Sequence, residues 1–237
     1  MPGQLAQELD ELGFVRMSSA RMRASLGLGP LSEWSRLRAS WELLPTEEGI
    51  AANGGSARRR GAVFLIGQNF IWRRTPRSQS QDGERLRFPS EIGTGVAPMA
   101  ADATSGALIN ALLQLARTTF SVADAASLWH VAMHQLRVET GPDRTSTSLR
   151  SLHCQAHERI VVLAVKRSGI AGGMAQLVAP GGTRIAALSL GRPLEALILD
   201  PRRVRLGITP IHPRKGALAG HWDILLMTFR KTTEWNS

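Results

Sequence analysis

MAQLVAPGGTRIAALS, residues 174–189, contains two short apolar runs separated by Pro180-Gly181-Gly182. Each run, 174–179 and 183–189, has the length of a β-strand. Glycine-rich residues between such runs are typical of the tight turns that join antiparallel strands. This stretch therefore predicts a β-hairpin.

Strand-like runs continue on both sides of the hairpin. They occupy residues 129–139, 159–166, 194–199, 204–211 and 222–230, with turn-forming residues between them. Many short strands separated by turns are typical of a β-sandwich or small barrel. The second half of the chain is therefore expected to form a β core.

The first half has mainly the periodicity of amphipathic helices. One helix is predicted by Leu5, Leu9 and Leu12 with Gly13 behind them, a second by Leu31, Trp34, Leu37, Trp41 and Leu44, and a third, capped by Thr104 or Ser105, by Leu108, Ile109, Leu112, Leu113 and Leu115. One buried strand is expected at 61–72. Helices followed by strands predict one α+β domain over 1–237, with 1–128 as its helical part and 129–237 as its core strands.

Composition favours a folded cytoplasmic protein. Apolar residues make up 43% of the chain, which is enough for a sizeable core. No apolar run approaches the ~20 residues that span a bilayer, and the N-terminus does not have the basic and apolar regions of a secretory signal. The single cysteine, Cys154, excludes an internal disulfide and fits a reducing compartment.

The net charge of +10 raises the question of nucleic-acid binding. The densest basic cluster consists of Arg58, Arg59, Arg60, Arg73, Arg74, Arg77, Arg85 and Arg87. No helix-turn-helix, zinc-finger or RNP-like pattern accompanies it. A solvated face or a funnel for anionic small molecules is the preferred interpretation, and nucleic-acid binding is kept as the alternative.

Several segments of the C-terminal half resemble one known family in order and spacing. They are residues 133–138 (MHQLRV), 152–159 (LHCQAHER), 172–173 (GG), 192–200 (RPLEALILD), 203–210 (RVRLGITP) and 221–230 (HWDILLMTFR). They look like the bacterial 2-oxoglutarate/Fe(II) dioxygenases that hydroxylate free amino acids, such as L-isoleucine 4-hydroxylase. This resemblance implies a double-stranded β-helix, or jelly-roll, core buttressed by N-terminal helices.

The resemblance also implies a metal site, and the chain departs from it at three positions. Members hold iron with a His-x-Asp pair and a second histidine, and they bind 2-oxoglutarate through an arginine. Here His153 matches the first histidine, Gln155 stands at the carboxylate, Leu206 at the second histidine and Trp222 at the arginine. We therefore expect neither Fe(II) nor 2-oxoglutarate as a cofactor, and His153 is the sole expected ligand if any metal binds.

Other polar residues of the resembling region are candidate site residues. His153, His157 and Glu158 are candidate acid–base groups for a metal-free cyclisation, elimination or isomerisation. A pocket is expected to involve His134, Gln155, Leu206 and Trp222, with Arg137 and Arg230 either binding a substrate carboxylate or forming structural ion pairs. The histidines are otherwise hydrogen-bonded residues of a former site, or ligands of a relocated zinc, iron or haem. His212 and His221 are expected to face solvent.

The functional prediction is a small-molecule enzyme with a dioxygenase fold. Its expected substrate is an amino acid or an amino-acid-derived metabolite of a biosynthetic pathway, and its chemistry differs from ordinary Fe(II)/2-oxoglutarate hydroxylation. Two alternatives stay open: a catalytically dead paralogue that binds a ligand or a partner protein, and a true hydroxylase with a non-standard metal site. No membrane partner is expected, and a homodimer is left open.

Overall fold

A computed structural model describes residues 2–45, 56–74, 97–120, 127–141 and 158–232. Within these residues a large antiparallel sheet contains, in spatial order, β1 (Phe14–Met17), β9 (Ala196–Leu199), β5 (Arg159–Ser168), β12 (Gly220–Thr232), β4 (Leu128–Thr140), β2 (Ser56–Ile66) and β3 (Ile71–Arg74). A smaller sheet contains β10 (Arg205–Ile208), β7 (Met174–Val178) and β8 (Arg184–Ser189), and β11 (Ile211–Pro213) pairs with β6 (Ile170–Gly172). The β core expected from the sequence is confirmed.

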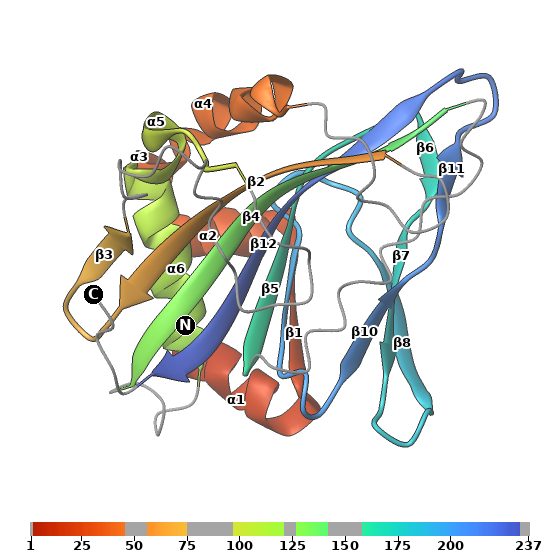
Figure 1. Ribbon diagram of the computed structural model, residues 1–237. Coiled ribbons are helices and arrows are strands. Elements are labelled where there is room, and N and C mark those ends of the chain that lie inside the picture. The colour runs from red at the N-terminus through yellow and green to blue at the C-terminus, as the bar shows by residue number, and fades with distance from the viewer. Residues whose placement is uncertain (1, 46–55, 75–96, 121–126, 142–157, 233–237) are drawn as a thin grey trace.

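The large sheet lies between helices on one face and the small sheets on the other (Figure 1). Strand alternation produces these two faces, because successive side chains point to opposite sides of a sheet. On β12, Leu225, Met227 and Phe229 pack with the helices, whereas Ile224 and Leu226 pack against the small sheets. We call these faces the helix face and the inner face.

The helix face is covered by elements from the first half of the chain. They are α1 (Pro2–Leu12), α2 (Ser19–Leu26), α3 (Leu28–Leu31), α4 (Trp34–Ala39), the 3-10 helix η1 (Ser40–Leu43), α5 (Ala101–Thr104) and α6 (Ala107–Thr119). Their buried side chains and the helix face form one apolar cluster. The α+β class is therefore confirmed.

The sequence predicted one continuous helix from Leu31 to Leu44, and this prediction is wrong. The chain forms α3, α4 and η1 instead, although the expected core residues Trp34, Leu37 and Trp41 are buried. The hydroxyls of Ser32 and Ser40 donate to the carbonyls of Gly29 and Leu37 (2.7 and 2.6 Å) at the two breaks. Serine side chains compete for backbone groups in this way and interrupt helices.

The cap of the third helix also differs from the expectation. Thr104 donates its hydroxyl back to the carbonyls of Ala100 and Ala101, and Ser105 lies outside the helix. The carboxylate of Glu33, far away in sequence, accepts a hydrogen bond from the Leu108 N–H at 2.9 Å. This backbone hydrogen bond lowers the pKa of Glu33 below its ordinary value. A side chain from another element therefore caps α6.

Most strand predictions are confirmed, but two of the expected strands are each split into two shorter strands. The hairpin at 174–189 forms, and Gly182 N donates to the Ala179 carbonyl in its turn. The run 204–211 divides into β10 and β11, because Pro210 has no N–H to continue a ladder. The strand expected at 61–72 begins earlier, at Ser56, and turns back at Gly67, whose N–H donates to the Phe70 carbonyl.

No helix among the described residues is long and apolar enough to span a membrane.

Candidate functional site

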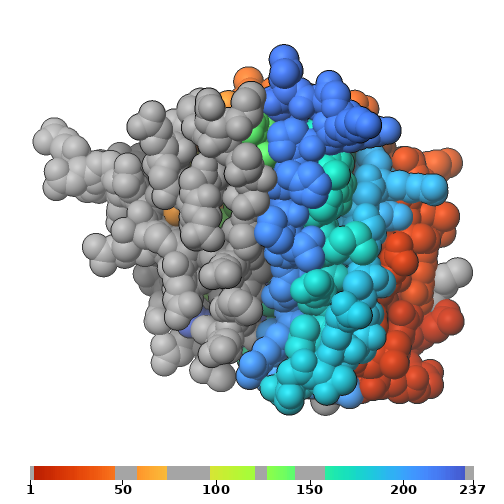
Figure 2. All heavy atoms as spheres, turned by 90° about the vertical axis from the view of Figure 1, so that its right-hand side faces the viewer, coloured from red at the N-terminus to blue at the C-terminus, as the bar shows by residue number. Residues whose placement is uncertain are grey.

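Leu206 and Trp222 lie in the same apolar core between the large sheet and the small sheets. Leu206 comes from β10, where it pairs with Leu177 of β7, and it is 4% exposed. Trp222 comes from β12, where it pairs with Val138 of β4, and it is fully buried. The structure therefore brings these two expected pocket residues into one cluster. Figure 2 shows the outer surface of this half of the molecule, where strands of 170–213 cover the core.

The indole of Trp222 is enclosed by an arginine and a glycine. The guanidinium Cζ of Arg167 lies 5.0 Å from the ring centroid, which is a cation–π distance. Arg167 also donates to the carbonyls of Gly172 (2.6 Å) and Gly173 (3.4 Å). A Cβ built on Gly173 would lie 3.3 Å from the Trp222 ring, so the glycine allows the close approach. Burial lowers the pKa of Arg167.

The indole of Trp222 carries one polar atom, the nitrogen Nε1, into this apolar core. Its Nε1–H is buried and makes no hydrogen bond with the described residues. Buried donors are nearly always hydrogen-bonded in native proteins, so such an atom requires an explanation.

His134 and Arg59 add polar groups to the inner face. His134 is 1% exposed and pairs with Gly61 of β2 on one side and with Leu226 of β12 on the other. Arg59 is 4% exposed and pairs with Leu136, which belongs to the inner-face core. The sequence analysis included Arg59 only as part of a surface cluster. Its burial was foreseeable from alternation, but the expected strand began too late, at Gly61.

Arg137 lies on the helix face, away from Leu206 and Trp222. It makes a bidentate pair with Asp223, from Nε to Oδ1 at 2.7 Å and from Nη2 to Oδ2 at 2.9 Å. It also donates to both carboxylate oxygens of Glu42 in η1 (2.9 and 3.0 Å). The hydrogen bond to Asp223 is the main cause that raises the pKa of Arg137. The described contacts of Arg137 are therefore those of a structural ion-pair partner.

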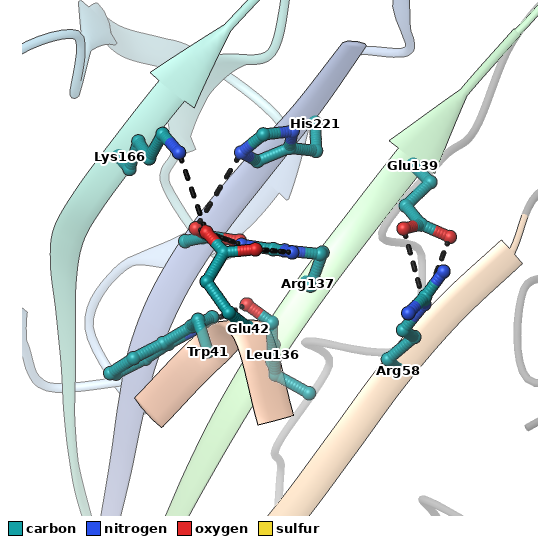
Figure 3. Close-up of polar contacts among 9 residues, drawn as sticks. Trp41, Glu42, Arg58, Leu136, Arg137, Glu139, Lys166 and His221 are labelled. Atoms are coloured by element: carbon teal, nitrogen blue, oxygen red, sulfur yellow. Dashed lines mark hydrogen bonds and ion pairs between the residues drawn. The ribbon is translucent and has the colours of Figure 1, made fainter. Parts of the chain in front are cut away.

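Further charged groups complete this network at the end of the large sheet (Figure 3). Lys166 Nζ lies 3.4 Å from Glu42 Oε1, and His221 Nε2 lies 3.7 Å from Asp223 Oδ2. The hydrogen bonds from Arg137 lower the pKa of Glu42 from 4.5 to about 2. His221, which was expected to face solvent, is partly buried, and this burial lowers its pKa. His212 is exposed as expected.

Glu158 and Arg230 lie apart from Trp222. Glu158 precedes β5, where its carboxylate accepts the Lys231 N–H at 3.2 Å and lies 3.6 Å from Lys231 Nζ and 4.0 Å from Arg202 Nη1. Arg230 is exposed on β12, eight residues from Trp222, which corresponds to about 26 Å along a strand. His153, Gln155 and His157 lie outside the described residues.

The basic cluster of residues 58–87 is divided between several environments. Arg58 pairs with Glu139 at 3.1 Å on the helix face, and Arg73 donates to the Met99 carbonyl at 3.0 Å. Arg59 lies on the inner face. The structure does not describe the side chains of Arg74, Arg77, Arg85 and Arg87. The described part of the cluster therefore does not form one continuous exposed surface.

Comparison with solved structures identifies the fold. IDO from Bacillus thuringiensis superimposes with a TM-score of 0.74 at 14% identity, covering 98% of this chain and 100% of that one. A bsmA homologue from Methylobium petroleophilum PM1 gives 0.74 at 20% identity, covering 97% and 92%. TqaL, an Fe(II)/α-ketoglutarate-dependent dioxygenase, gives 0.73 at 12% identity, covering 99% and 88%. The expected double-stranded β-helix with N-terminal helices is thus confirmed.

Comparison by sequence gives the family. No curated protein matches the chain. The model of the 2OG-Fe dioxygenase family matches residues 38–228, which is well over half of the sequence and includes both the large sheet from β2 onward and the small sheets. The chain therefore belongs to the 2OG-Fe dioxygenase family.

Proposed function

We infer that this family member binds an amino acid or an amino-acid-derived metabolite between its sheets and acts on it without ordinary Fe(II)/2-oxoglutarate hydroxylation. The observation that carries the proposal is the complete burial of Trp222 between Arg167 and Gly173. In the family pattern this position belongs to the arginine that binds 2-oxoglutarate.

The iron site is the first part of the family chemistry that the residues do not fit. Leu206 stands where the second histidine is expected, and its side chain offers only hydrocarbon in an apolar core. The carboxylate position is Gln155, a neutral amide that cannot balance the charge of Fe(II). A single remaining ligand, His153, is too few for a facial triad.

The 2-oxoglutarate site is the second part of the family chemistry that the residues do not fit. An indole cannot form the bidentate charged pair that a guanidinium forms with a carboxylate. The nearby cation, Arg167, stacks on that indole and donates to two backbone carbonyls. These contacts support a role for Arg167 in packing rather than in anchoring the co-substrate.

The remaining polar groups favour a small-molecule site over an inert core. His134, Arg59 and the Nε1–H of Trp222 stand among apolar side chains on the inner face. Small-molecule sites combine an apolar lining with a few polar groups in this way. Because Glu158 is engaged in ion pairs at the end of β5, the acid–base role in this proposal falls to His153 and His157.

Anaerobic titration with Fe(II) and 2-oxoglutarate tests the proposal. We expect no metal-to-ligand charge-transfer band and no succinate release with any of the twenty amino acids, whereas an intact family member treated identically shows both. A band or succinate release would restore the hydroxylase alternative. A second experiment distinguishes a metal-independent enzyme from a catalytically dead paralogue. Amino-acid mixtures are incubated with the protein in EDTA and analysed by mass spectrometry. A new product supports the enzyme, and binding without a product supports the ligand-binding paralogue.

A further inference from the structure

The layer formed by the small sheets carries positive charge and no negative charge. Residues 170–189 and 205–220 contain β6, β7, β8, β10 and β11, and they include no aspartate or glutamate. The same segments include four exposed cations: Arg184, Arg205, Arg214 and Lys215. Figure 2 faces the outer side of this layer and shows the two segments at the molecular surface. We call this side the small-sheet surface.

These four cations make no ion pair with the residues that the structure describes. The carboxylates that lie between the two segments in the chain, Glu195 and Asp200, have other partners. Glu195 accepts backbone N–H groups of the preceding turn, and Asp200 binds the guanidiniums of Arg159 and Arg202. Surface charge of one sign creates a potential that attracts a partner of the opposite sign.

Strand register places two of the arginines side by side on the small-sheet surface. Val178 of β7 pairs with Arg205 of β10 on one side and with Arg184 of β8 on the other. The neighbouring residues Leu177 and Leu206 face the core, so Val178 and Arg205 face outward. Two strand spacings separate the arginines, which corresponds to roughly 10 Å between their Cα atoms. The width of a groove of duplex DNA is similar, about 6–12 Å.

The small-sheet surface offers no aromatic ring for a nucleic-acid base to stack on. Residues 170–189 and 205–220 contain no phenylalanine, tyrosine or tryptophan. Proteins that bind single-stranded nucleic acids stack the bases on such side chains. In a duplex the bases already stack on each other, and cations bind the phosphates without reading the sequence. The surface therefore fits a duplex better than a single strand.

An anionic lipid bilayer would also attract these cations, but it requires an apolar face as well. Bilayer-binding surfaces present a continuous apolar face beside their basic residues. The large apolar side chains exposed on these two segments are Ile185 and Leu218. They lie on separate elements, β8 and the loop after β11, and single exposed aliphatic side chains are common on protein surfaces. The composition therefore favours nucleic acid over a bilayer.

We propose that the small-sheet surface binds the phosphate backbone of a nucleic-acid duplex, independently of base sequence. Its four cations are spread over β8, β10 and the segment after β11, so they match a chain of phosphates rather than one small anion. A guanidinium pairs with two phosphate oxygens in parallel. The surface lies on the other side of β7 and β10 from the core of Leu206 and Trp222, so the inference goes beyond the proposed small-molecule function and does not depend on it.

The test is fluorescence anisotropy of a labelled 20-base-pair DNA duplex titrated with the full chain, from 20 to 200 mM NaCl. We expect binding whose logarithmic salt dependence has a slope of about −3 to −4, since each phosphate contact contributes about −0.9. Arg184→Gln, Arg205→Gln should weaken binding at least tenfold at low salt and reduce the slope by about 2. Arg214→Gln, Lys215→Gln changes the other two cations and should have a similar effect, so the test stands if one double variant does not fold.

Arg23→Gln, Arg38→Gln is the matched control, because it removes the same charge from exposed arginines of α2 and α4 on the helix side of the molecule. We expect it to leave affinity within twofold of wild type. Failure to bind the duplex at 20 mM NaCl, or equal losses in the control and in both test variants, would overturn the proposal. Tighter binding of a single strand of the same length would overturn it too, as would binding of phosphatidylglycerol vesicles, but not of the duplex, that the test variants lose.

Discussion

The guanidinium of Arg167 lies over the indole of Trp222, with 5.0 Å between its Cζ and the ring centroid. A register shift between Asp223 and Ile224 makes this contact possible, because β5 inserts Val165 there and its later residues change faces. Val165 packs with the helices, whereas Arg167 reaches the Trp222 side. Trp222 and its cationic neighbour therefore form one packed unit.

Restoring the family residues should restore iron binding only in part while Arg167 is present. The triple variant Gln155→Asp, Leu206→His, Trp222→Arg places a second guanidinium beside Arg167, and the new buried polar groups cost about 2–5 kcal/mol if the site stays dry. Adding Arg167→Ser should tighten binding of Fe(II) and 2-oxoglutarate, measured by the anaerobic charge-transfer band. The control is the double variant Gln155→Asp, Leu206→His, which keeps Trp222 and so lacks the arginine that would bind 2-oxoglutarate. A folded quadruple variant that ignores iron would show that the positions are wrongly assigned.

Removing one partner of the Arg137–Asp223 pair should destabilise the protein strongly. Both side chains are nearly inaccessible, so Arg137→Met leaves a buried carboxylate without its cation, at a cost of about 3–5 kcal/mol. The double variant Arg137→Met, Asp223→Leu should recover most of this loss. Urea denaturation of wild type, Arg137→Met, Asp223→Leu and the double variant measures the coupling between the two side chains. Arg58→Met, which breaks a partly exposed pair with Glu139, should cost only about 0–1 kcal/mol.

Glu42 should make stability depend on acid pH. Its pKa falls from 4.5 to about 2 in the folded protein, so its stabilising contribution is complete above 4.5 and disappears as the pH falls toward 2. Wild type should therefore lose more unfolding free energy than Glu42→Gln between pH 5 and pH 3. Because the side chain is 57% exposed, 1 M NaCl should reduce the difference. Parallel pH profiles of the two proteins at low salt would contradict the prediction.

Gly173→Ala should destabilise the region around Trp222. Gly173 has a φ of +64°, and a Cβ there would lie 2.9 Å from Ile211 Cγ2 and 3.3 Å from the indole. The left-handed backbone alone costs about 1–2 kcal/mol for an alanine. The melting temperature should fall by several degrees, with a change in near-ultraviolet circular dichroism from Trp222. Gly181→Ala, where a Cβ meets nothing within 4 Å, is the control and should leave both unchanged.

The strands and helices that sequence reasoning missed depend on distant partners. β1 was not expected, and it forms by pairing with β9, from Phe14 to Leu199 and from Met17 to Ala196. Helix α2 was not expected either, since its apolar pattern is weak, but Ser18 caps it and Met22 and Leu26 are buried against other elements. Short elements of this kind gain their stability from tertiary contacts rather than from propensity.

By itself, the sequence determined the α+β class, the hairpin around Pro180-Gly181-Gly182, and the apolar character of Leu206 and Trp222, because these follow from local periodicity, turn chemistry and side-chain type. Only the tertiary structure decided which charged residues share a face. For Arg137 the sequence left a substrate contact and a structural ion pair open, and the structure shows the ion pairs with Asp223 and Glu42. Arg59 was expected only as part of a basic cluster, and it is buried on the inner face. The physical reason is that strand register, bulges and partners distant in sequence set the direction of each side chain.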